Sequence, residues 1–130
     1  IIMNMVRDIV QKERKPELMQ VVTSMKLDEI NRTLIDNNVF NTMHIDIEPI
    51  SFKYNLLLSL SGNENLSNKI SLYFYDVSSI KMKNIGGGLT QFMHLKISII
   101  DIFNDRNKYI IEDVEDEKIS FEFNAVDFLG

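Results

Sequence analysis

Cysteine is absent from the 130 residues of this sequence. Its absence excludes disulfide bonds, thiolate metal ligands and a cysteine nucleophile, and it is compatible with a reducing compartment. We therefore expect a cytoplasmic protein. Long apolar runs are missing as well: the three leucines at 56–58 fall far short of the ~20 residues that a membrane-spanning helix needs. No membrane association is predicted.

An excess of basic residues is also missing. The chain has 14 Lys and Arg against 19 Asp and Glu, a net charge of −5. Proteins that bind nucleic acids take their affinity from clustered Lys and Arg that face phosphates. The composition therefore argues against a nucleic-acid partner.

Motifs for cofactors and metals are not found either. The glycines at 86–88 lack the Lys and hydroxyl residue of a phosphate-binding loop, and the residues after them break the dinucleotide signature. We interpret the glycines as a bulge or a sharp bend between two strands that uses positive φ. The Asp and Asn residues at 101–107 lack EF-hand spacing and are typical of a turn. We predict no cofactor and no bound metal.

The first third of the chain has the apolar spacing of helices. Three stripes follow one another, around residues 6–10, 18–25 and 27–34, and the run Asp36, Asn37, Asn38 ends the pattern. The second and third stripes form either one helix or two. Residues 1–37 are thus predicted to be a helical N-terminal segment.

From Val39 onward the apolar residues alternate with polar ones, which is typical of half-buried strands. The connections are short, and this favours antiparallel pairing, because parallel strands need long crossovers. We predict one α+β domain over residues 1–130, in which N-terminal helices precede a curved, mainly antiparallel sheet over residues 38–130. The sheet has six to seven strands, arranged as a half-barrel or sandwich, with at least one helix covering its open side. The predicted strands lie at 43–47, 52–60, 70–75, 80–83, 93–99, 109–114 and 119–123.

Two histidines raise the question of catalysis. His44, Asp46 and Glu48 share one strand face, and His94 lies on another predicted strand. A histidine with carboxylates could bind a divalent metal or act as a general base, provided that the strands are neighbours. The competing interpretation is that these polar residues form the solvent-facing side of their strands.

The last thirty residues carry the charge imbalance of the chain. Residues 101–130 contain nine acidic and three basic side chains, which gives −6. The densest acidic run precedes Lys118 and is interrupted by Val114. One interpretation is a solvated hairpin end; the other is a surface that attracts a basic partner. The candidate partner-binding residues are Glu112, Glu115, Asp116 and Glu117.

Three stretches carry a resemblance to a known family: residues 70–80 (ISLYFYDVSSI), 85–88 (IGGG) and 109–121 (YIIEDVEDEKISF). Over residues 40–128 the chain resembles the YxiG-like family of small bacterial proteins. The sequence departs from the family's Phe-His-Asp element, since it has Phe40, Asn41 and Thr42. The resemblance implies an immunity protein of a polymorphic-toxin locus and brings no catalytic residue with it.

These observations lead to three hypotheses. The first is a non-enzymatic protein-binding module, an immunity-type antagonist of a basic toxin domain, because an acidic surface speeds encounter with a basic one. The second is a structural or assembly protein that forms a homo-oligomer through its N-terminal helices. The third is a metal-dependent enzyme that uses His44, Asp46 and His94.

Overall fold

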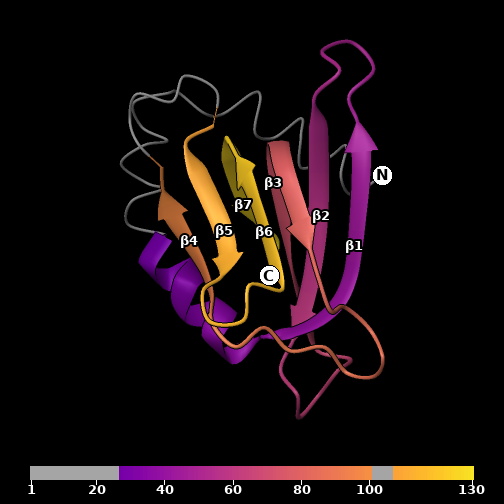
Figure 1. The fold of residues 1–130 in the computed structure, drawn as a ribbon, viewed down its shortest axis with the longest axis vertical. Helices are drawn as coiled ribbons and strands as arrows, with labels where there is room; N and C mark the ends of the chain where they lie inside the picture. The colour runs from indigo at the N-terminus through magenta and orange to yellow at the C-terminus, as the bar shows by residue number, and fades with distance from the viewer. Residues whose placement is uncertain (1–26, 101–106) are drawn as a thin grey trace.

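The computed structural model describes residues 27–100 and 107–130, in which one helix, residues 27–36, precedes an antiparallel sheet of seven strands (Figure 1). The predicted combination of helix and mainly antiparallel sheet is confirmed at this level. The plural N-terminal helices are not: only the third apolar stripe appears as a helix, and the stripes at 6–10 and 18–25 lie outside the described residues. The strands are β1 Val39–Ile47, β2 Tyr54–Ser61, β3 Lys69–Met82, β4 Leu95–Ile99, β5 Tyr109–Asp113, β6 Ile119–Phe123 and β7 Ala125–Phe128.

The sheet consists of two three-stranded meanders joined in the middle. The strand order is β1-β2-β3-β6-β5-β4, and β7 also pairs with β3. β6 and β7 are separated only by Asn124, whose N–H donates to the Tyr75 carbonyl at 2.9 Å. They therefore act as one interrupted strand beside β3, with β7 along its first half and β6 along its second half.

Two residues with positive φ interrupt the regular geometry of β3. Asp76 has a φ of 53° and Ser79 a φ of 54°, and the pairing register shifts nearby, toward β2 and toward β6. The Asp76 N–H donates to the buried Asn55 side chain at 3.1 Å, so the irregularity leaves this amide bonded. Such bulges increase twist and bend a strand. Here they let one long strand serve both meanders.

The same bulges explain an error in the predicted strand list. Residues 80–83 are predicted to be a separate strand, but residues 80–82 continue β3. The extra residues at the bulges interrupt the alternation of apolar and polar residues along β3. The sequence pattern therefore predicts two strands where the structure has one. The seventh strand is instead β7, Ala125–Phe128, which the sequence prediction missed.

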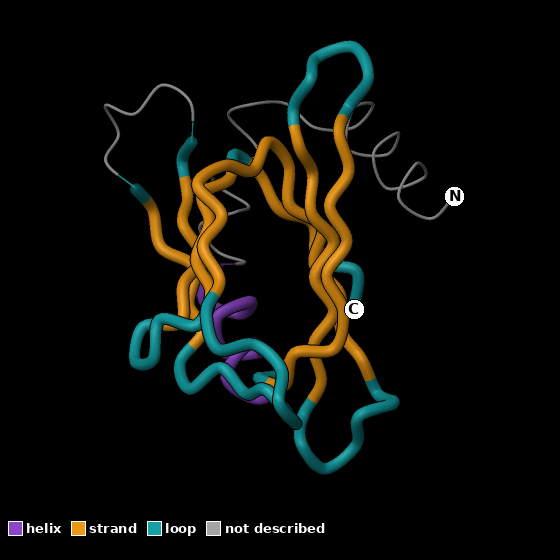
Figure 2. The backbone as a smooth tube through the Cα atoms, turned by 45° about the vertical axis from the view of Figure 1, so that its right-hand side comes forward, coloured by secondary structure: helices purple, strands orange, loops and turns teal. Residues whose placement is uncertain are grey.

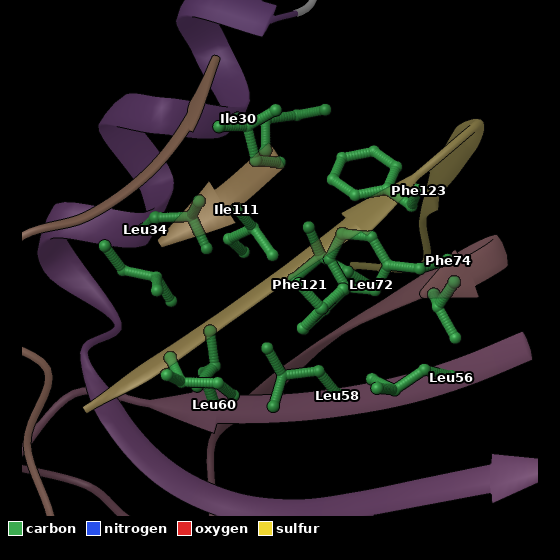
Figure 3. Close-up of a cluster of buried hydrophobic side chains, with 14 of the residues drawn as sticks. Ile30, Leu34, Leu56, Leu58, Leu60, Leu72, Phe74, Ile111, Phe121 and Phe123 are labelled. Carbon is green, nitrogen blue, oxygen red and sulfur yellow. The ribbon is translucent and has the colours of Figure 1, made fainter. Parts of the chain in front are cut away.

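The inner face of the sheet holds one hydrophobic core. Figure 3 shows Phe74 of β3 beside Phe121 and Phe123 of β6, with ring centroids 4.9 and 4.8 Å apart. Ile30 and Leu34 of the helix point toward the same core and are four residues apart, as one helical face requires (Figure 3). Burying a Phe or Leu side chain stabilises the fold by about 1.5–3 kcal/mol, so this cluster dominates the stability of the domain.

The strands curve around the core, and the helix lies at one end of them (Figure 2). At that end the two edges of the sheet come together. The Phe40 N–H donates to the Thr90 carbonyl at 2.9 Å, and the Phe92 N–H donates to the Asn38 carbonyl at 2.8 Å. This small bridge ties the start of β1 to the segment that leads into β4.

The triple glycine forms the bend expected from the sequence. Gly86, Gly87 and Gly88 all have positive φ, at 97°, 72° and 121°. They lie between β3 and β4, where a residue with a side chain would be strained. Among the residues that the structure describes, no helix has the length and apolar character needed to cross a membrane.

Candidate partner-binding surface

The acidic run forms the end of β5 and the turn between β5 and β6. Asp113, the last residue of β5, holds this turn in place. Asp113 is only 1% exposed. Its carboxylate accepts the His94 N–H at 3.0 Å and the Lys118 N–H at 3.3 Å, and its carbonyl accepts the Glu117 N–H at 2.9 Å. Hydrogen bonds to a charged acceptor are about twice as strong as neutral ones. Asp113 therefore clamps the turn to the start of β4.

Three of the four predicted residues lie on this clamped turn. Glu115, Asp116 and Glu117 are exposed, and Glu117 has a φ of 55°, which closes the turn before β6. The turn thus presents three carboxylates to solvent from a backbone that is held at both ends. The interpretation of this segment as a hairpin end is confirmed.

Glu112 occupies a different position from the other three. It lies within β5 and is half-buried, with its side chain on the outer face of the sheet. Its neighbours in the register are Lys96 on β4 and Ser120 on β6. Opposite charges on directly paired residues attract, so Lys96 offsets part of the charge of Glu112.

A second lysine lies next to the turn itself. Lys83, just past the end of β3, has its Nζ 3.6 Å from Glu117 Oε2. Both side chains are more than half exposed, so the pair contributes little to stability. Sequence reasoning did not place Lys83 and Lys96 beside the acidic residues, because both lie far from them in the chain. Among the residues that the structure describes, the strongest uncompensated charge at the turn is therefore at Glu115 and Asp116.

The buried role of Asp113 was also missed, although a signal for it exists. The alternation that puts Tyr109 and Ile111 on the inner face puts Asp113 there too. An acidic residue on an apolar face needs hydrogen-bond donors when it is buried. The position of Asp113 on the inner face could therefore have been predicted from the alternation in β5.

The condition for the composite histidine site, that the strands of His44 and His94 are neighbours, is not met. His44 is on β1 and His94 directly precedes β4, and these two strands are the opposite ends of the sheet order. His94 instead lines a groove of about 410 Å³ between the helix and β4, together with Arg32 and Lys96. Within residues 27–100 and 107–130, no three His, Cys, Asp or Glu side chains are grouped to hold a metal ion.

His44 and Asp46 do share one face of β1, as predicted. His44 Nε2 lies 3.0 Å from Asp46 Oδ2, and the side chains are 58% and 48% exposed. This arrangement agrees with the solvent-facing interpretation of the strand.

Comparisons with protein-family models, curated proteins and solved structures return no match. The resemblance to the YxiG-like family therefore stays a prediction.

Proposed function

We propose that this protein is a non-enzymatic binding module whose β5–β6 turn meets a basic surface on another protein, in the manner of an immunity protein that covers a toxin domain. The observation that carries the proposal is the pair of exposed carboxylates, Glu115 and Asp116, on a turn clamped by the buried Asp113. The YxiG-like resemblance supports the same function.

The clamp matters because binding is weakened when a loop must be ordered. A turn whose backbone is already fixed avoids much of that entropic cost. The N–H groups of His94 and Lys118 bond the Asp113 carboxylate and thereby fix the backbone of the turn. The side chains of Glu115 and Asp116 are exposed on this fixed backbone. The arrangement is that of a preformed acidic contact.

Charge complementarity is expected to act mainly on the rate of encounter. Opposite surface charges raise association rates by roughly tenfold to a thousandfold, and salt screens the effect. Lys83 and Lys96 moderate the field at Glu117 and Glu112. The contribution of Glu115 and Asp116 should therefore exceed that of the other two predicted residues.

The probe for the test is a basic toxin domain, sought first in the reading frames next to the one that encodes this chain. We expect the double variant Glu115→Lys, Asp116→Lys to lower the association rate by about tenfold or more at low salt. Reversal of Glu112 and Glu117 should have a smaller effect. Surface plasmon resonance at two salt concentrations measures both.

A matched control is the double variant Glu29→Lys, Glu64→Lys. It makes the same change in net charge at exposed residues of the helix and of the β2–β3 connection. The control should retain most of the wild-type rate, and all variants should keep the thermal midpoint nearly unchanged. Equal rates for the wild-type protein and the Glu115, Asp116 variant would refute the proposal.

A further inference from the structure

β1 is an edge strand along most of its length. On one side it pairs with β2 from Val39 to Ile47. On its other side, within the described residues, the only pairing is the bridge of Val39 with Gln91. A bulge between Phe40 and Thr42 separates this bridge from the rest of the strand. Residues 42–47 therefore form an edge on which another strand can pair.

The ladder determines which backbone groups face that edge. The Glu48 N–H donates to the Lys53 carbonyl at 2.7 Å, just beyond the pair of Ile47 with Tyr54. Hydrogen-bonded and non-hydrogen-bonded pairs alternate along an antiparallel ladder. It follows that Met43, Ile45 and Ile47 direct their N–H and C=O groups away from β2.

The same three residues place their side chains on the inner face of the sheet, where Met43 lies opposite Leu58 and Ile45 opposite Leu56. The core does not cover them fully: Ile45 is 42% exposed and Ile47 48% exposed. The edge therefore combines outward backbone groups with apolar side chains that retain contact with water.

The sequence of this edge is complementary to itself. If a second copy of the strand runs antiparallel with Ile45 at the centre, Ile45 faces Ile45 of the second copy, and Met43 faces Ile47. His44 then lies opposite Asp46 of the second copy, and Asp46 opposite its His44. A two-fold symmetric interface requires this reciprocity, because the same patch of each copy contacts its counterpart.

The two histidine–aspartate pairs would fall at favourable positions. The central Ile45 pair is hydrogen-bonded, so His44 and Asp46 of the second copy form a non-hydrogen-bonded pair, in which Cα atoms approach to about 4.5 Å and side chains are closest. His44 and Asp46 are both accessible on the outer face. Each His44 would lie between its own Asp46 and that of the second copy.

We propose that two copies of this protein associate through antiparallel pairing of their β1 edges, centred on Ile45, to form a sheet continuous across the dimer. A second copy is the occupant favoured by the pattern, because a foreign strand would not require His44 and Asp46 to complement each other. The proposal is independent of the partner-binding turn, since β1 and β5 are separated by three strands in the sheet order.

The test is sedimentation velocity on the full chain over a wide concentration series, with charge variants at the proposed pairs. We expect the wild-type mass to rise from monomer to dimer with concentration. Asp46→Lys places Lys opposite His44 and removes the attraction, and His44→Glu places Glu opposite Asp46. Each variant alone should lose the dimer.

The mixture of these two variants provides the sharpest result. In a heterodimer, His44 of the first variant faces Asp46 of the second, and the new Lys faces the new Glu. We expect the mixture to dimerise although neither variant does so alone, and the double variant His44→Glu, Asp46→Lys to regain the homodimer. Such rescue specifies the register, which a general loss of folding could not imitate.

The matched control is Glu64→Lys, which changes the net charge as Asp46→Lys does but lies at an exposed position outside β1. It should dimerise as the wild type does. A wild-type mass that stays monomeric throughout the series overturns the proposal. So does a dimer that survives both single variants, or a mixture that stays monomeric, because association would then not use this register.

Discussion

The two edge strands of this sheet, β4 and β1, are covered to very different degrees. On β4, the Asn31 side chain of the helix bonds both backbone groups of Ile97: its Nδ2 donates to the carbonyl at 3.0 Å, and its Oδ1 accepts the N–H at 2.8 Å. Leu95 and Ile97 are each 1% exposed. On β1, the inner-face residues Ile45 and Ile47 remain close to half exposed.

This difference shows that a few side chains are sufficient to protect an edge strand. The amide side chain of Asn31 makes the two backbone hydrogen bonds that a neighbouring strand would make. Ile30 and Leu34 of the same helix pack against the apolar core. The cover is local, because Ile99 at the far end of β4 is 59% exposed. An edge is thus protected residue by residue, and β1 keeps the open part that we assign to a second copy.

The largest effect on stability is expected at Phe74, which lies on β3, the strand that joins the two meanders. Phe74→Ala removes a buried ring that contacts Phe121 and Phe123, so we expect a loss of about 3–5 kcal/mol in the free energy of unfolding. Denaturant titration measures this loss, and hydrogen exchange should rise at Ile97 and Leu56 together.

The control for Phe74 is Phe128→Ala on β7, a ring that is 44% exposed. It should cost about 1 kcal/mol or less. If Phe74→Ala increased hydrogen exchange in the β1–β2–β3 meander but not in the β4–β5–β6 meander, the two meanders would not unfold cooperatively. The edges β1 and β4 would then belong to two separate folding units.

An intermediate effect is expected at the covered edge. Asn31→Ala leaves the N–H and C=O of Ile97 without their side-chain partner, at a cost of about 1–3 kcal/mol. The Ile97 amide should exchange faster, while the amides of the β1–β2 ladder stay protected. Hydrogen exchange followed by NMR separates the two edges.

Arg32→Ala is a suitable reference for this experiment, since it alters the adjacent, exposed residue of the same helix. It should change stability by no more than about 0.5 kcal/mol. An Asn31 variant as stable as the Arg32 variant would show that the helix covers β4 by apolar packing alone.

The smallest effect is expected at the open edge. His44 and Asp46 are an exposed pair on β1, and such pairs contribute about 0–1 kcal/mol. His44→Ala should therefore leave the unfolding midpoint nearly unchanged in dilute protein, where monomers prevail. A loss well above 1 kcal/mol would mean that this pair is part of the fold of the monomer.

The candidate surface could be predicted in part. The density of acidic residues between two alternating segments located the turn and its exposed Glu115, Asp116 and Glu117. The neighbouring Lys83 and Lys96 could not be found in the same way, because they reach the surface from other strands. Pairing His44 with His94 failed for the same reason, since a shared pattern does not reveal which strands are neighbours.

Patterns within the chain were sufficient for the local features: the helix that ends at Asp36, the strand faces, the bend at the three glycines and the position of the acidic turn. These depend on period and on residue conformation, which neighbours in the chain set. Contacts between distant segments set the strand order, the pairing of β3 with both meanders, the burial of Asp113 and the contrast between β1 and β4. Many strand orders satisfy the same alternation, and only contacts between distant residues select one of them.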